Sequence, residues 1–270
     1  MRMKNGHTVI WGGVTLGEGM PKIAVPVMGG DLSAIREAAS RAARAGADII
    51  ELRIDSLSPM PRLATALAAC AAVRDGAGNI PLLFTLRTAR DGGPGSSEAA
   101  AYEALLRGVA EAGVCEAIDC ELSVGEAVFR RVVDAAHAAG VSVVGSSHAF
   151  TPLEEVCIAG QWLIRQRALG ADVCKAAVMA RDELDSLRAS LAMLTAAQEI
   201  DAPVIAITMG ESGVLSRVGA ECLGSCLTFG TAGEASAPGQ MDAVALRGVL
   251  RAIHDSRTGG AEKKFCMRPL

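Results

Sequence analysis

The feature that most constrains the fold is an eightfold alternation between short apolar runs and Ala-rich stretches with helical spacing. The apolar runs are rich in β-branched residues, which is typical of buried strands. They lie at 22–28, 48–55, 81–87, 115–122, 141–148, 172–179, 203–209 and 226–230. Helical stretches follow at 31–45, 61–74, 97–112, 124–139, 181–198, 214–222 and 241–254, and the fifth of the eight opens at Thr151-Pro152 with Thr as its cap. Eight such units in one chain match a (β/α)8 barrel in number and length.

The rival architecture is an open, doubly wound sheet. It would usually carry a G-x-G-x-x-G phosphate loop after the first strand, but Gly29-Gly30 is followed here by Asp31. The near-continuous apolar runs also suit strands that are covered on both faces. We therefore predict an α/β fold, a (β/α)8 TIM barrel in a single domain over 1–270. Residues 1–21 are expected to form a hairpin that closes the barrel bottom, and 257–270 a flexible tail.

Composition excludes several functional classes. The formal net charge of −4 provides no basic field to neutralise phosphates, which excludes a nucleic-acid partner. No apolar run approaches the ~20 residues of a membrane span, and the charged N-terminus lacks the apolar core of a signal peptide. Several of the eight cysteines sit within apolar runs, as free thiols do, and the near pair Cys222 and Cys226 has no histidine or second pair beside it. We expect a cytoplasmic protein without membrane or metal.

One lysine stands out among the ionisable residues near the strand ends, where a barrel forms its site. Lys175 is the only lysine between Lys22 and Lys263, and it lies in the apolar run Val-Cys-Lys-Ala-Ala-Val-Met. Burial lowers the pKa of an ammonium group, and a neutral amine can attack a ketone to form a Schiff base. The residues alone leave open a structural lysine that is paired with a carboxylate of a neighbouring strand.

His148 and three arginines are expected to share the barrel mouth with this lysine. His148 follows Gly-Ser-Ser at the end of the adjacent strand, and imidazole is the usual proton shuttle near neutral pH. Arg53, Arg87 and Arg217 could clamp a substrate carboxylate. They could also form structural ion pairs with the carboxylates of neighbouring strands, and we expect some of both. Those carboxylates are Glu51, Asp55, Asp119 and Glu121.

Seven short motifs carry a resemblance to a known family, in the family's order and spacing. They are Glu51-Leu-Arg53-Ile-Asp55, Phe84-Thr-Leu-Arg87-Thr-Ala-Arg90, Ile118-Asp119-Cys-Glu121-Leu122, Gly145-Ser-Ser-His148, Lys175, Gly213-Val-Leu-Ser-Arg217, and Thr228-Phe-Gly230 followed by Ala235-Ser-Ala-Pro-Gly-Gln240. Together they resemble the type I 3-dehydroquinate dehydratases of the shikimate pathway. The closing Ser-Ala-Pro-Gly-Gln segment is the most specific of them.

The resemblance implies a (β/α)8 barrel that dehydrates 3-dehydroquinate to 3-dehydroshikimate with no cofactor and no metal, commonly as a homodimer. It makes Lys175 the Schiff-base lysine, His148 the general acid–base and Arg217 the holder of the substrate carboxylate. The further substrate contacts that it implies are Glu51, Arg53, Arg87, Met209, Ser236 and Gln240. The family usually orients the histidine with a glutamate, whereas this sequence has Asp91, which is one methylene shorter.

Two other functions stay open on the residues alone. A class I aldolase would also place a lysine in a barrel strand, although it usually has Gly-rich phosphate loops after the last two strands. A non-catalytic sensor barrel could bind the same ligand. The presence of both Lys175 and His148 argues against a sensor, because binding alone needs no nucleophile.

Overall fold

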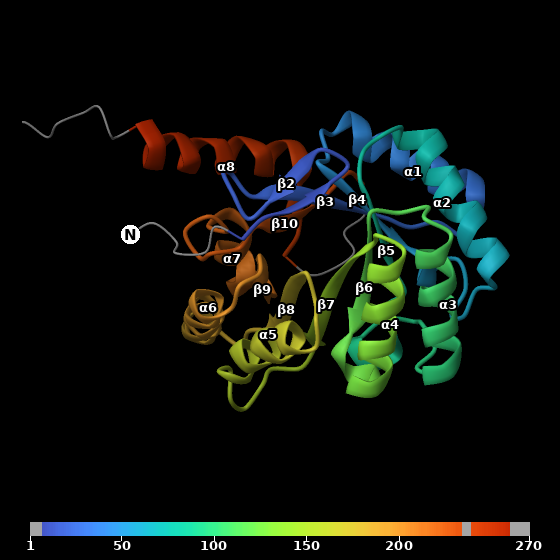
Figure 1. Cartoon of the computed structure of the whole chain (residues 1–270). Coiled ribbons are helices and arrows are strands. Elements are labelled where there is room, and N and C mark those ends of the chain that lie inside the picture. The colour runs from blue at the N-terminus through green and yellow to red at the C-terminus, as the bar shows by residue number, and fades with distance from the viewer. Residues whose placement is uncertain (1–6, 234–238, 260–270) are drawn as a thin grey trace, which may run out of the picture.

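Eight parallel strands form a closed barrel in the computed structural model, which describes residues 7–233 and 239–259 (Figure 1). The strands are β3 (Lys22–Val27), β4 (Ile49–Arg53), β5 (Leu82–Thr85), β6 (Ala117–Glu121), β7 (Ser142–Ala149), β8 (Val173–Met179), β9 (Val204–Met209) and β10 (Leu227–Thr231). From β3 to β9 each strand pairs with the next along the chain, and β10 pairs with β3. A bridge from Val204 to Ser225, together with the Cys226 N–H that donates to Val204 O at 2.8 Å, closes the ring between β9 and β10. The predicted barrel is confirmed.

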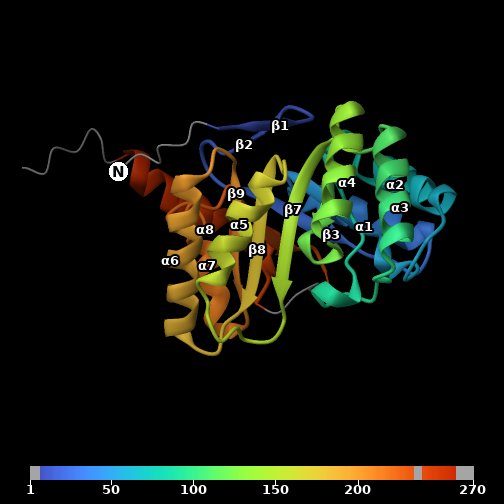
Figure 2. The same ribbon diagram turned by 60° about the horizontal axis from the view of Figure 1, so that its bottom comes forward.

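Helices cover the outside of the barrel (Figures 1 and 2). They are α1 (Leu32–Arg44), α2 (Leu63–Ala77), α3 (Ala99–Glu111), α4 (Glu126–Ala138), α5 (Ile158–Ala168), α6 (Glu183–Glu199), α7 (Val214–Val218) and α8 (Ala243–Thr258). Short 3₁₀ turns follow four strands, at η1 (Ile54–Ser56), η2 (Ala89–Asp91), η3 (Leu122–Val124) and η4 (Glu211–Gly213), and β11 (Met241–Asp242) pairs with the end of β10. Over the two described ranges, no helix has the length and apolar character needed to cross a membrane.

The period-2 alternation of each strand sorts its residues between the barrel interior and the helices. In β8, Val173 and Ala177 belong to the interior cluster, whereas Cys174 and Ala176 pack into the layer between strands and helices. Lys175 has the same parity as Val173 and Ala177, so its side chain is directed into the barrel. The same alternation directs Glu51, Asp119 and Ser146 inward from β4, β6 and β7.

The predicted N-terminal hairpin is present and fills one end of the barrel. β1 (Val9–Trp11) and β2 (Val14–Leu16) are joined by Gly12 and Gly13, both at positive φ, as a tight two-residue hairpin turn requires. Trp11 and Leu16 are buried in the interior cluster. Figure 2 shows the hairpin across the end of the barrel opposite to that toward which the arrows of β7 and β8 point. The hairpin therefore closes the bottom, and the site must open at the other end.

Several helix boundaries differ from the prediction. The cap predicted at Thr151-Pro152 is wrong, because α5 begins at Ile158 with Cys157 at its cap position. Phe150 stacks on His148 with 6.5 Å between ring centroids, which places the chain after β7 at the barrel mouth. Residues 151–157 then connect this point to the start of α5. α7 ends at Val218 rather than near residue 222. The first two residues of the expected tail, 257 and 258, belong to α8.

Candidate active site

A cavity of about 460 Å³, part of it open to solvent, lies at the C-terminal ends of the strands. Most of the predicted site residues line it, namely Glu51, Arg53, Arg87, His148, Lys175, Met209, Arg217 and Gln240. Asp91 is buried behind His148 and is not among the lining residues. Ser236 lies outside the described residues. The structure thus brings together side chains from β4, β7, β8 and β9 and from the segments that follow β5, β9 and β10.

Lys175 reaches the cavity from the middle of β8 and is almost fully buried. Its Nζ lies 3.7 Å from Glu51 Oε1 and 3.6 Å from Asp119 Oδ2, and 4.6 Å from the centre of the Phe229 ring. Burial lowers the pKa of Lys175, and the two carboxylates only partly oppose this effect. The amine is thus paired with carboxylates of neighbouring strands, as expected for a structural lysine. It also faces the cavity, and its lowered pKa favours the neutral, nucleophilic form.

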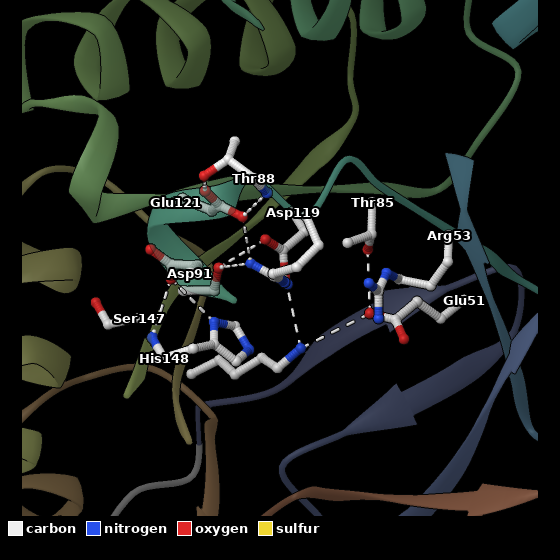
Figure 3. Close-up of polar contacts among 12 residues, drawn as sticks. Glu51, Arg53, Thr85, Thr88, Asp91, Asp119, Glu121, Ser147 and His148 are labelled. Carbon is white, nitrogen blue, oxygen red and sulfur yellow. Dashed lines mark hydrogen bonds and ion pairs between the residues drawn. The ribbon is translucent and has the colours of Figure 1, made fainter. Parts of the chain in front are cut away.

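His148 lies at the end of β7 with its imidazole held from behind by Asp91 (Figure 3). Asp91 Oδ2 lies 3.0 Å from both the Nδ1 atom and the backbone N of His148. A carboxylate can only accept, so Nδ1 carries the proton and the lone pair of the neutral ring is on Nε2. Burial, followed by the charges of Arg87 and Lys175, lowers the pKa of His148 well below its ordinary range. The ring is therefore a neutral base at pH 7.

Arg87 is the centre of a buried ion network beside the amine. Its guanidinium donates to Asp119 Oδ2 and Glu121 Oε1, both at 2.8 Å, and to Ser146 Oγ at 3.1 Å. Burial would raise the pKa of Asp119, but Arg87 and Lys175 outweigh it and lower that pKa to about 2. Glu121 behaves in the opposite way, because burial outweighs Arg87 and raises its pKa to about 7. Most donors of Arg87 are thus used within the protein.

The other two arginines differ in how they are held. Arg53 forms a two-pronged pair with Asp55, at 3.0 and 2.7 Å, and Asp55 also accepts from the Arg87 backbone N at 2.9 Å. Arg217 is almost fully buried at the cavity, and burial lowers its pKa to about 10, so it is still a cation at pH 7. Gly239 fits against this corner, because a Cβ there would meet Gly210 O at 2.7 Å.

Sequence reasoning found Met209 but missed the other apolar residues of the lining, which are Phe150, Ala177, Ile207 and Phe229. Ala177 and Ile207 are indistinguishable in sequence from ordinary interior residues of their strands. Phe229 could have been noticed, since it lies in the Thr-Phe-Gly part of a quoted motif and contacts Lys175 across the barrel. Phe150 lies two residues after His148, beyond the strand end that the pattern indicated.

The arrangement suits carbonyl chemistry on a small anionic molecule. Two adjacent strands carry an amine of lowered pKa and a neutral imidazole, and the arginines beside them could bind a carboxylate. Within the described ranges, no cluster of three or more histidine, cysteine or acidic side chains is arranged to hold a metal ion.

Comparisons with known proteins agree with this description. Residues 23–257 match the family model described as type I 3-dehydroquinase. The 3-dehydroquinate dehydratase of Klebsiella pneumoniae subsp. pneumoniae is 42% identical over 240 residues, which cover 88% of this chain and 95% of that protein. The one from Listeria monocytogenes serotype 4a is 38% identical over 250 residues, or 92% and 98% of the two chains.

Solved structures give the same result at the level of the fold. The type I 3-dehydroquinate dehydratase of Clostridium difficile superposes with a TM-score of 0.85 at 35% identity, over 92% of this chain and 98% of that one. The 3-dehydroquinate dehydratase of Geobacillus kaustophilus gives a TM-score of 0.88 at 29% identity, over 94% and 98%. These matches favour a dehydratase over the aldolase and the sensor that the residues left open. The chain belongs to the type I 3-dehydroquinase family and is a hydro-lyase.

Proposed function

We propose that the chain dehydrates 3-dehydroquinate to 3-dehydroshikimate through an imine on Lys175, with His148 as the general acid–base and Asp91 as the residue that orients it. The observation that carries the proposal is the placement of the Lys175 amine and the His148 ring in the walls of one cavity. Burial favours the neutral form of both groups. An amine that attacks and a base that accepts a proton both need that form.

The reaction then runs in four balanced steps. Lys175 Nζ attacks the C3 carbonyl, and the adduct takes up one proton from solvent and loses water to give a protonated imine; that proton is released again when the imine is hydrolysed. His148 removes the C2 proton, and the electron pair moves toward the imine nitrogen, which acts as the electron sink. The pair then returns to form the C1–C2 double bond as the C1 hydroxyl leaves, protonated to water by the same imidazole. Water hydrolyses the imine and restores the amine, so one water is released per turnover.

The substrate is expected to lie with its carboxylate on Arg217. This guanidinium keeps its charge in a buried corner of the cavity, where an ionic hydrogen bond is strongest. Glu51, Arg53, Arg87, Met209 and Gln240 complete the expected contacts, and Ser236 is expected to join them from outside the described residues. Arg87 acts mainly through Asp119 and Glu121, because these carboxylates accept from both of its terminal nitrogens.

Borohydride trapping tests the mechanism. We expect incubation with 3-dehydroquinate and borohydride to leave a reduced adduct on Lys175, which mass spectrometry assigns readily because no other lysine lies between Lys22 and Lys263. Lys175→Met should give no adduct and no turnover. His148→Ala should still be trapped but turn over about 10²–10⁴-fold more slowly. Full turnover without an adduct on Lys175 would exclude the imine and leave the activity standing.

The relative from Clostridium difficile was solved with covalent modified comenic acid. A covalent ligand in that relative is what a nucleophilic site would allow, and it supports the same test here. A cytoplasmic location and a homodimer complete the proposal. Light scattering on the purified chain would distinguish two copies per particle from one.

A further inference from the structure

Gln166, near the C-terminal end of α5, is a fully buried polar side chain that the mechanism above does not use. Its Oε1 accepts from the backbone N of Lys175 at 3.0 Å. Its Nε2 donates to Lys175 O at 3.0 Å and to Ser147 Oγ at 3.0 Å. One side-chain amide therefore satisfies both backbone polar groups of Lys175, one as acceptor and one as donor, and its second donor goes to Ser147.

These contacts reach the two reactive residues from behind. Lys175 directs its side chain into the barrel, whereas Gln166 approaches its backbone from the helix side. Ser147 is the residue before His148 in β7, and Figure 3 shows the two as immediate neighbours. Gln166 thus ties the strand segment that carries the amine to the segment that carries the imidazole.

The packing around Gln166 leaves it little freedom. A Cβ added at Gly145 of β7 would lie 3.0 Å from the Cβ of Gln166 and 2.9 Å from that of Ala171, so this glycine provides the space in which the side chain lies. The carbonyl oxygen of Gln166 accepts from the backbone N atoms of Leu169 and Ala171, both at 3.1 Å. The residue is fixed at its backbone, at its stem and at its amide.

We propose that Gln166 is a positioning residue for the reaction: through the Lys175 backbone and Ser147 it sets the distance between the amine and the imidazole. The inference rests on the proposed function, in which these two groups act on adjacent carbons of one substrate. A displacement of about 1 Å in such a pair can cost about 10²-fold in rate. The loss should fall on proton removal, which needs both groups in place, more than on substrate binding.

Two variants of Gln166 separate positioning from general stability. Gln166→Met keeps the approximate volume but removes the acceptor and both donors. Gln166→Glu keeps an oxygen for the Lys175 N–H and can accept from Ser147, whose hydroxyl rotates, but it cannot donate to Lys175 O. We expect Gln166→Met to lower kcat about 10–100-fold with KM changed less than about threefold. Gln166→Glu should recover part of the loss.

Single-turnover trapping locates the affected step. In Gln166→Met, borohydride added at successive times after mixing should still trap an adduct on Lys175, and should trap it over a longer period than in the wild type, because the imine decays more slowly when the base is misplaced. The matched control is Ser225→Ala. Ser225 Oγ is buried, accepts from Ala206 N at 3.0 Å and donates to Leu227 O at 2.8 Å, so it also joins strand backbones, but it has no link to either reactive residue.

The outcomes decide between the ideas. Wild-type kcat in Gln166→Met, or an equal loss of kcat in Ser225→Ala at equal loss of thermal stability, would overturn the positioning role. If Gln166→Met does not fold, Gly145→Ala serves in its place, because it displaces an intact amide and should slow decay of the imine in the same way. Absence of an adduct on Lys175 in the wild-type protein would instead contradict the proposed function.

Discussion

Replacing Asp91 by asparagine tests how this site directs its base. Asp91 Oδ2 accepts two hydrogen bonds from His148, one from the backbone N and one from Nδ1, both at 3.0 Å, in a place that is almost fully buried. The backbone bond is the same before and during the reaction, so its weakening affects stability. The Nδ1 bond strengthens as the ring takes up the substrate proton and becomes positive, so its weakening affects kcat.

The size of the effect follows from the loss of one charge. A hydrogen bond to a charged acceptor contributes about 1.5–3 kcal/mol, and one to a neutral acceptor about 1 kcal/mol. Asparagine therefore stabilises the imidazolium less than aspartate does, and it no longer offsets the repulsion from the nearby cations in this buried site. Together the two effects cost about 1.5–3 kcal/mol of transition-state stabilisation, which corresponds to about a 10- to 150-fold fall in kcat. KM should change little, because Asp91 does not line the cavity. Asp91→Glu, which keeps the charge, should lose less.

The assay follows the absorbance of the enone product in steady state. Glu116→Gln is the matched control, because Glu116 also accepts from a backbone N, that of Leu82 at 2.6 Å, and from a cation, Arg74, but its partners are not cavity residues. It should lower stability and leave kcat unchanged. An Asp91→Asn variant with kcat within threefold of wild type, or with its loss confined to KM, would refute the view that Asp91 directs the imidazole.

Three further predictions address the cavity wall, the barrel bottom and the amine. Gly92→Ala should raise KM, because φ there is +79° and the new Cβ would meet the Phe150 ring at 2.2 Å. The control Gly113→Ala, at φ +63° with open space around it, should lower the melting temperature through backbone strain and leave KM unchanged. Trp11→Ala should cost about 3–5 kcal/mol in urea unfolding with unchanged kcat, and a loss of activity at full stability would contradict its structural role. The rate of imine formation should rise with pH up to the lowered pKa of Lys175 and level off below pH 10.5. A rate that still rises past pH 10.5 would exclude a lowered pKa for this amine.

Sequence patterns predicted the barrel well because its strands and helices repeat one local rule. Each strand is an apolar run that is covered on both faces. Each helix has its apolar residues spaced so that they lie on one face, which packs on the strands. The start of α5 shows the limit. Thr151-Pro152 is a sound local cap, but the packing of Phe150 on His148 is a contact between residues that no capping rule considers.

The site was predictable where a residue type is rare in its setting. A lysine in an apolar strand and a histidine at a strand end are such cases. Arg87 shows what sequence leaves open, since its motif is the same whether its donors face a substrate or, as here, mostly Asp119 and Glu121. Gln166 gave no signal, because a glutamine in a surface helix is ordinary until the strand behind it is known.

The Arg87 network has a consequence for redesigning this enzyme. β5 pairs with β6 at only two residue pairs, Leu83 with Ala117 and Phe84 with Ile118. Beyond them, the seam between the two strands is continued by the Arg87 guanidinium on Asp119 and Glu121. The ions that surround the amine are therefore also part of the wall. A redesign for a substrate of different charge should therefore keep Arg87 and alter the opposite side of the cavity. A substitution at Arg87 would change both the charges around the amine and the contact between β5 and β6.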